Sequence, residues 1–330
     1  MLAALDEVAT AQSGVFTVGQ ARAAGYTDEE IRSHIRLRHW VRRRRGVYCS
    51  ADVWSAAAPD AGRVHLLDCA AVLVSLDRAA TVSHASAAVL HALVRPAVAP
   101  PEVALTDPAN WRTGRGYRVS QAQLPPLDVV PWGGFRATSV ARTLVDCARE
   151  WGLVDAVVAM DDALHRQLVV PSALQDVVAR ERRWEGVATA ARAVGLADGL
   201  AESPLESRGR VLIVTSGLPA PELQVELWDC DGFIGRVDGW YEDAAVAVEF
   251  DGAVKYLDPR GGRSPGEVLW REKRREDRLR ATGVRPVRLA QQDFGAGWVA
   301  SRRRLRELLA APHLGRRDFT VVRTARRLAG

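Results

Sequence analysis

The chain lacks the features of a membrane-spanning or exported protein. No uninterrupted apolar run approaches the ~20 residues that a helix needs to cross a bilayer. The first residues, Met1 to Glu7, carry no basic segment ahead of an apolar stretch, so we expect no signal peptide. We therefore predict a cytoplasmic protein with no membrane partner.

Cysteine is scarce, and its spacing excludes the usual uses of cysteine clusters. The four cysteines lie far apart and form no CxxC pair, so neither a disulfide framework nor a zinc site is expected. We interpret all four as buried, reduced thiols, which are usual in a cytoplasmic protein. They are Cys49, Cys69, Cys147 and Cys230.

Lysine is almost absent. Only Lys255 and Lys273 are lysines among the 45 basic residues. The heavy use of arginine and alanine indicates a compositional bias of the source genome, so an arginine by itself says little about function. A lysine that is present despite this bias is a better candidate for a specific role.

What the chain does contain is basic charge in two blocks, with a formal net charge of +5. Residues 32–45 hold seven arginines, two histidines and no acidic residue, and residues 270–330 hold 17 basic residues against six acidic ones. Two basic blocks separated by a nearly neutral middle indicate a polyanion that is contacted in two places. We predict double-stranded DNA as this partner; solvated charged faces are the alternative.

The length and the residue pattern indicate several domains. A chain of 330 residues is long enough for two or three domains, and 48% hydrophobic with 26% charged residues is typical of a globular protein. We predict a multidomain α+β and α/β protein. The expected parts are a winged helix (1–50), a mixed, mainly helical domain (51–196), an α/β domain (200–312) and a basic tail (313–330).

The first 50 residues show the pattern of a winged helix-turn-helix. Thr17 can cap a helix that ends near Ala24, and Thr27 to Glu30 form a capping box for the next helix. Trp40-Val41, four arginines and Gly46 to Tyr48 then predict a β-hairpin wing with a basic tip.

This geometry is that of a DNA reader. The third helix would enter the major groove, and the arginines of the wing would reach phosphates or the minor groove. A winged helix that contacts only proteins is the alternative, but four adjacent arginines need a counter-charge, which phosphates supply. The predicted DNA contacts are Arg32, Arg36, Arg38, Arg42, Arg43, Arg44 and Arg45.

The middle of the chain is predicted to be mainly helical, with short strands between the helices. Ser83 is expected to cap a helix that carries His84 and His91. No acidic residue or cysteine accompanies these histidines locally, so we interpret them as structural. The expected helices are 66–76, 83–93, 139–150 and 154–168, and the expected strands are 103–105, 117–119 and 127–130.

The pattern changes after residue 200. Ser203 caps a helix with Pro204 in its first turn. Asp229-Cys230-Asp231-Gly232 is a hairpin turn between two strands; it lacks the later ligands of a calcium loop. The expected elements are a helix from 203 through 214, strands 222–228, 234–240 and 245–250, a basic helix 267–281, a strand 284–289 and a helix 298–309.

Acidic residues of this last part can converge. Asp238 ends the second strand, and Glu249 and Asp251 share one face of the third, because strand side chains alternate. Glu206 projects from the opening helix. Acids on an otherwise apolar strand are costly unless they bind something, and a divalent cation is the natural partner. Solvated acids at strand ends are the alternative.

Such a cation can activate water and stabilise phosphate charge during phosphodiester hydrolysis. We predict Asp238, Glu249 and Asp251 as ligands of Mg²⁺ or Mn²⁺. Glu206 and Lys255 are the further catalytic candidates, since Lys255 lies four residues past Asp251. On the basic helix we predict DNA contacts by Lys273, Arg274 and Arg278.

Motifs between residues 200 and 312 resemble an uncharacterised domain family related to the very-short-patch-repair endonuclease, within the PD-(D/E)XK nuclease superfamily. The resemblance implies a restriction-endonuclease-like α/β fold, with Asp238 and Glu249 as metal ligands and Glu206 as a helper. Where the superfamily has a lysine, this chain and the related family have an acid, here Asp251; Lys255 is the neighbouring replacement. The motifs are 202–208, 217–219, 235–240, 248–252, 274–279 and 285–289.

The first 50 residues, with Ser83 to Ala88 and Thr138 to Asp146, resemble the AbiEi-type antitoxin family over about residues 1–170. Members of this family carry a winged helix and regulate the transcription of toxin–antitoxin operons. The two resemblances imply two functions. The first is a DNA-binding, Mg²⁺-dependent endonuclease or nickase. The alternative is a transcriptional regulator or antitoxin with a toxin partner, whose nuclease-like domain only grips DNA or protein.

Overall fold

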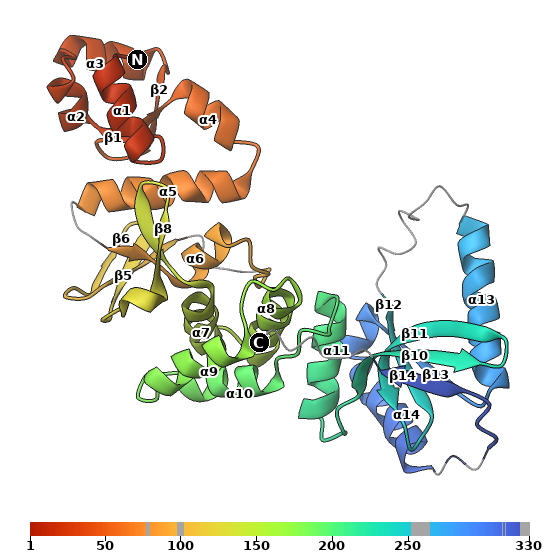
Figure 1. Cartoon of the computed structure of the whole chain (residues 1–330). Coiled ribbons are helices and arrows are strands. Elements are labelled where there is room, and N and C mark those ends of the chain that lie inside the picture. Colours follow the sequence, from red (N-terminus) through yellow and green to blue (C-terminus); the bar gives the residue numbers. More distant parts are fainter. Residues whose placement is uncertain (77–79, 98–101, 252–264, 312, 314, 324–330) are drawn as a thin grey trace. The chain divides into compact units, whose positions relative to one another are not determined.

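The computed structural model divides the chain into two compact units, and each is described by itself (Figure 1). The first unit comprises residues 1–152 and 171–191, and the second comprises residues 153–170 and 192–330. The boundary predicted near residue 196 is therefore incomplete, because residues 153–170 belong to the second unit. The structure describes residues 1–76, 80–97, 102–251, 265–311, 313 and 315–323.

The first unit begins with the elements of a winged helix, as predicted. Thr17 and Thr27 each close a capping box, with Gln20 and Glu30 respectively, and so fix where two of the helices start. The strands form a three-stranded sheet in the order β1-β3-β2. The elements are α1 (Ala3–Ala11), β1 (Val15–Thr17), α2 (Val18–Ala23), α3 (Asp28–Arg36), β2 (Trp40–Arg44) and β3 (Val47–Ser50).

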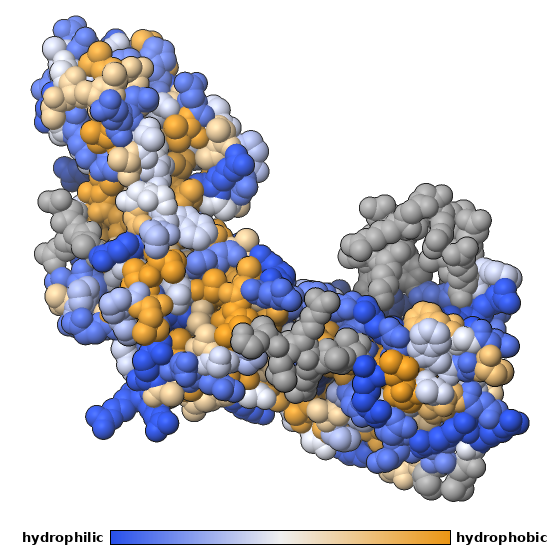
Figure 2. All heavy atoms as spheres, in the orientation of Figure 1, coloured by the Kyte–Doolittle hydropathy of each residue, from blue (hydrophilic) through white to orange (hydrophobic). Residues whose placement is uncertain are grey.

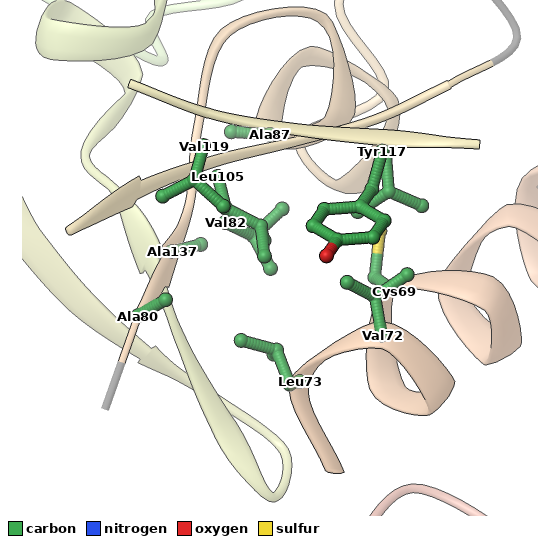
Figure 3. Packing of buried hydrophobic residues seen from close by; sticks show 11 residues of the cluster. Cys69, Val72, Leu73, Ala80, Val82, Ala87, Leu105, Tyr117, Val119 and Ala137 are labelled. Carbon is green, nitrogen blue, oxygen red and sulfur yellow. The ribbon is translucent and has the colours of Figure 1, made fainter. Parts of the chain in front are cut away.

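Two helices follow, α4 (Ala51–Ala57) and α5 (Ala61–Leu76), and α5 is the central support of the first unit. One side of α5 packs with the small sheet, where Leu67 shares a core with Val15 and Val47. Its other side packs on a second sheet. Figure 3 shows Cys69, Val72 and Leu73 of α5 together with Leu105 and Val119 of that sheet.

The second sheet is larger than the sequence predicted. It has six strands in the order β6-β7-β5-β4-β9-β8. The additional strands are β4, β6 and β9, and they escape prediction because β4 has two residues, every residue of β6 is exposed and β9 has only four residues. The elements are β4 (Thr81–Val82), α6 (His84–Leu90), β5 (Val103–Asp107), β6 (Arg112–Gly114), β7 (Tyr117–Gln121), η1 (Pro126–Asp128), β8 (Val129–Trp132) and β9 (Phe135–Thr138).

A buried ion-pair network holds the helices of the first unit. Arg142 of α7 (Val140–Glu150) is 2% exposed; its Nε lies 2.8 Å from Asp146 and its Nη1 lies 2.6 Å from Glu181. Glu181 follows α9 (Pro171–Arg180). The motif of residues 138–146 thus serves the fold by satisfying buried charges. The next helix, α10, spans Val187–Leu196.

The second unit starts with α8 (Leu153–His165), which packs against α11 (Pro204–Thr215). Ser203 caps α11 as predicted, accepting a hydrogen bond from the backbone N–H of Glu206. Arg210 of α11 binds Asp161 of α8 at 2.7 Å, with both side chains buried. This ion pair explains why α8 belongs with the C-terminal part.

The sheet of the second unit has five strands in the order β13-β12-β11-β10-β14. Strands β12 and β13 are parallel, and the other neighbours are antiparallel. Val246, Val248 and Phe250 pack on one core, and Ala247 packs on the other, so both faces are covered. The elements are β10 (Glu222–Asp229), β11 (Gly232–Tyr241), β12 (Val246–Asp251), α13 (Pro265–Ala281), β13 (Arg285–Ala290), η2 (Gln291–Phe294), α14 (Trp298–Ala310) and β14 (Thr320–Arg323).

Two predictions need correction. Residues 313–330 were expected to be a tail, but β14 joins the sheet beside β10, with Val225 opposite Arg323. Cys230 is exposed on the β10–β11 turn, whereas Cys49, Cys69 and Cys147 are buried, as expected.

The last helix, α14, presents a strongly basic surface. Leu305 of α14 is buried, while Arg303, Arg304 and Arg306 are exposed. On the face shown in Figure 2, hydrophilic side chains cover much of the surface around this helix. In the described part of the chain, no helix has both the length and the apolar character that crossing a membrane requires.

Candidate functional site

The candidate DNA reader is α3 with the wing, which we define as the hairpin β2–β3 (residues 40–50). Arg32 and Arg36 of α3 are exposed, and so is Arg38 in the turn that follows it. None of the three forms an ion pair with a described residue. The capping box at Thr27 leaves Asp28 to Glu30 in the first turn, so the basic side chains lie toward the C-terminal half of the helix.

The arginines of the wing fall into two groups. Arg42 and Arg45 are exposed. Arg43 is held by the protein itself: its Nη2 lies 2.5 Å from Asp68 of α5, and its guanidinium lies 4.4 Å from the centroid of the Trp54 ring. We conclude that Arg43 fixes the wing to α5, so this predicted DNA contact has a structural role.

Arg44 also has protein partners. Its Nη1 donates to the backbone carbonyl of Arg115 at 3.1 Å, and its guanidinium lies 4.9 Å from the Tyr117 ring. Both contacts are with the hairpin β6–β7. The arginine run therefore supplies two outward charges, from Arg42 and Arg45, and two attachments of the wing to the rest of the first unit.

The histidines His84 and His91 have the structural role that the sequence predicted. His84 is buried, its Nδ1 lies 2.9 Å from Ser83 Oγ, and burial lowers its pKa. His91 Nε2 contacts the carbonyl of Thr138 at 2.7 Å. Ser83 is the N-cap residue of α6, but its side chain makes no capping hydrogen bond. Since Ser83 and His84 are both buried, a substrate has no access to them.

The acids predicted on β11 and β12 do meet in the second unit. They line a small cavity of about 60 Å³, which we call the acidic cavity. The cavity also contains side chains that the sequence analysis did not select, three of them arginines. Its lining residues are Arg236, Asp238, Glu249, Phe250, Asp251, Glu272, Arg275 and Arg288.

Each predicted ligand in the acidic cavity already has a partner. Asp238 Oδ2 accepts a hydrogen bond from the backbone N–H of Phe250 at 2.8 Å. Glu249 Oε1 lies 2.5 Å from Arg275 Nη2, and its Oε2 lies 3.7 Å from Arg288 Nη2. Arg288 Nη1 lies 3.6 Å from Asp251 Oδ2.

Glu206 lies beside the cavity rather than in its lining. Its carboxylate accepts hydrogen bonds from Ser203 Oγ at 2.7 Å, from the Glu202 N–H at 2.9 Å and from Gln224 Nε2 at 2.9 Å. Burial raises the pKa of Glu206, and the neighbouring Asp238 raises it further. Glu206 is thus near the acids, but its oxygens serve the start of α11.

The acidic cavity as placed does not fit a divalent cation. Glu249 has arginines at both oxygens, and burial raises its pKa although Arg275 and Arg288 oppose that shift. Among the described residues, the group whose ligand atoms lie within 4.8 Å of one another is elsewhere, at Asp229, Cys230 and Asp231. Lys255 lies outside the described residues, so its predicted role stays a prediction.

Arg236, Glu272, Arg275 and Arg288 are the charged residues of the cavity that sequence reasoning missed. Two signals were present. Glu272 and Arg275 are three residues apart on the basic helix and so share one of its faces. Arg288 lies opposite Glu249 in the parallel pairing of β12 with β13. The first signal can be used only when the packing of α13 is known, and the second only when the register between β12 and β13 is known.

The predicted DNA contacts on α13 also divide. Lys273 and Arg274 are exposed, and the guanidinium of Arg274 lies 4.7 Å from the ring of the exposed Trp270. Arg278 instead forms an ion pair with Asp229 and donates to the carbonyls of Gly232 and Phe233, both at 3.2 Å. Arg278 therefore secures the β10–β11 turn, and its predicted DNA contact stays a prediction.

Relatives of the chain include two uncharacterised proteins of Mycobacterium tuberculosis, MT2308 of strain CDC 1551 / Oshkosh and Rv2248 of strain H37Rv, each 32% identical over 160 residues. The match covers 48% of this chain and 56% of each relative. The crystal structure of the RV2827C protein from M. tuberculosis matches 66% of this chain and 82% of its own, with 16% identity and a TM-score of 0.37. A likeness at this level carries no argument about the fold.

A family comparison bears on the winged helix. Residues 4–51 match the model of a family described as "Transcriptional regulator, AbiEi antitoxin". The match spans α1 to β3, and it therefore contains both the exposed arginines of α3 and the whole wing. The N-terminal part of the first unit is thus similar to AbiEi-type regulators over these residues.

Proposed function

We propose that the protein is a DNA-binding transcriptional regulator of the AbiEi antitoxin type, and that its winged helix reads the DNA. The observation that carries the proposal is the set of exposed arginines on α3 and at the wing tip, within the region that matches the regulator family. Guanidinium groups on a helix suited to the major groove can bind phosphates and base edges.

The attachment of the wing supports this proposal. Arg43 and Arg44 fix the wing to α5 and to β6–β7, so that Arg42 and Arg45 project from a supported hairpin. A supported wing loses less conformational freedom when it binds than a free loop would lose. We infer that α3 supplies the sequence-reading contacts and the wing supplies phosphate contacts.

The test is a titration of the full-length protein with duplexes from the promoter of its own operon, read by fluorescence anisotropy at several salt concentrations. We expect affinity to fall steeply with salt, because phosphate contacts release counterions. Arg32→Ala with Arg36→Ala should weaken binding about tenfold or more. Arg63→Ala is the matched control, since this exposed arginine lies on α5. Equal affinity of the double variant and the wild type would refute the reading role of α3.

A cognate toxin is the proposed protein partner, because the matched family is one of antitoxins. The expected result is that a toxin encoded beside this gene co-purifies with the full chain. If the product of the neighbouring gene neither binds the chain nor is neutralised by it, the antitoxin role is refuted. The proposed DNA-binding role is then tested by the titration alone.

Metal-dependent DNA cleavage is the second candidate function. The observation that favours it is that Asp238, Glu249 and Asp251, from neighbouring strands, line one cavity. The test is nicking of supercoiled plasmid in Mg²⁺ or Mn²⁺ by the wild type and by Glu249→Ala and Asp238→Ala. Activity that both variants retain would identify a contaminating nuclease and remove this candidate.

A further inference from the structure

The positive charges in the acidic cavity come from arginine side chains of the protein. Arg275 reaches Glu249 from α13, and Arg288 reaches Glu249 and Asp251 from β13. Arg236 also lines the cavity, but its Nη2 is paired with Glu202 at 2.6 Å. Arg275 and Arg288 are therefore the cations that offset the negative charge of the cavity carboxylates in this half-buried place.

The position of Arg275 is fixed from several sides. Its side chain passes over Gly235, where an added Cβ would lie 3.0 Å from Arg275 Cδ. Its Nη1 donates to the carbonyl of Arg236 at 3.4 Å, while its Nη2 binds Glu249. A glycine under the side chain and acceptors for both terminal nitrogens indicate a packed position.

Arg288 is fixed by the sheet. It lies opposite Glu249 in the β12–β13 register, and its Nη2 also lies 3.7 Å from Glu276 of α13. The two arginines therefore come from different elements and meet at the same carboxylate. A divalent ion that uses Glu249 would have to displace a guanidinium on each side, at the cost of two ion pairs.

We propose that Arg275 and Arg288 are built-in counter-cations that keep a divalent ion out of the acidic cavity in the free protein. The inference concerns the second unit and does not depend on DNA reading by the winged helix. Under this proposal, Asp238, Glu249 and Asp251 become available as oxygen ligands only when the two guanidinium groups are removed.

The experiment measures Mn²⁺ binding to the full chain by the loss of the free-ion electron paramagnetic resonance signal. We expect no saturable binding by the wild type. Arg275→Gln with Arg288→Gln should bind one Mn²⁺ saturably, because two positive charges leave the carboxylates. Adding Glu249→Gln to this double variant should abolish the gain.

The matched control is Lys273→Gln with Arg274→Gln, which removes the same two positive charges from exposed positions of α13 next to Arg275. It should bind Mn²⁺ no better than the wild type. An equal gain in the control would show a general charge effect and overturn the proposal. So would a folded double variant, judged by circular dichroism, that binds no Mn²⁺.

Mn²⁺ binding by the wild type tests the proposal even if the double variant does not fold. Saturable Mn²⁺ binding by the wild type that Glu249→Gln removes would show that the arginines do not exclude the ion. Arg275→Lys, which keeps the charge, should behave as the wild type does. DNA affinity is measured separately by anisotropy, so failure of this inference and failure of the regulator proposal have different readouts.

Discussion

The two basic runs look alike in sequence but differ in what their arginines contact. In the wing, Arg43 and Arg44 hold the run to its own unit, through Asp68 and a backbone carbonyl. In α13, Arg275 binds an acid of the candidate site, and Arg278 secures a turn. Both runs leave other basic side chains exposed.

The difference shows that an arginine run combines several functions. In the wing, the bound arginines support the exposed ones, to which we assign DNA binding, so under the proposed function the two groups act together. In α13, Arg275 pairs with Glu249, so the metal binding that the second candidate function requires would have to compete with this ion pair. Variants that separate bound from exposed arginines in each run test this comparison.

The largest effect is expected in the wing. Arg43→Ala removes a mostly buried ion pair and the contact with Trp54, so it should lower the free energy of unfolding of the first unit by about 2 kcal/mol. Arg42→Ala should change it by less than about 0.5 kcal/mol. Urea unfolding followed by tryptophan fluorescence measures both. Equal stability of the two variants would show that Arg43 contributes no more to the stability of the first unit than Arg42 does.

The next effect concerns DNA binding by the exposed pair. Arg42→Ala with Arg45→Ala should weaken binding to all duplexes alike. The slope of log affinity against log salt should fall by about 0.9 for each phosphate that the variant no longer neutralises. Anisotropy titrations on specific and unrelated duplexes measure both quantities. An unchanged slope would mean that the wing does not touch phosphates.

A smaller effect should separate two positions on α13. Arg278→Ala should lower the melting temperature of the second unit, because Asp229 and two carbonyls lose their donor. Arg274→Ala should leave the melting temperature unchanged and weaken DNA binding. Differential scanning calorimetry and anisotropy on both variants provide the comparison. The reverse pattern would exchange the roles that we assign to these two arginines.

The smallest effect is a pH dependence of the second unit. Burial raises the folded-state pKa of Glu206 and of Glu249, so the folded protein holds protons that the unfolded chain releases. The stability from this source is present below the usual glutamate pKa and is lost as pH rises through the raised values. Arg275→Gln should steepen this loss by raising the pKa of Glu249 further. Melting temperatures measured from acidic to neutral pH test the sign; a rise with pH that Glu249→Gln abolishes would contradict it.

Much of the fold could be predicted where the signal is local. The capping boxes at Thr17 and Thr27 fixed two helix starts, and the turn at residues 229–232 fixed a hairpin. Strands β1, β4, β6, β9 and β14 were missed because two to four residues show no usable periodicity. Such strands form because a partner strand is already in place.

The candidate sites could be predicted only in part. The alternation of β12 placed Glu249 and Asp251 on one face, and the structure brings both to one cavity with Asp238. The partners of the charges could not be predicted, because Asp68 lies 25 residues from Arg43, and Arg275 lies 26 residues from Glu249. Choosing among adjacent arginines requires distances in the folded chain.

The ion pair between Asp161 and Arg210 has a consequence for how the two units can be exchanged between proteins. The chain enters the second unit with α8, returns to the first with α9, and enters the second again after residue 191. A fragment that begins at residue 200, where the sequence predicts the last α/β domain to start, would carry Arg210 into its interior without the carboxylate that neutralises it. Recombination at that point would therefore give a misfolded product. A transferable second unit has to include residues 153–170, although the first unit surrounds them in the gene.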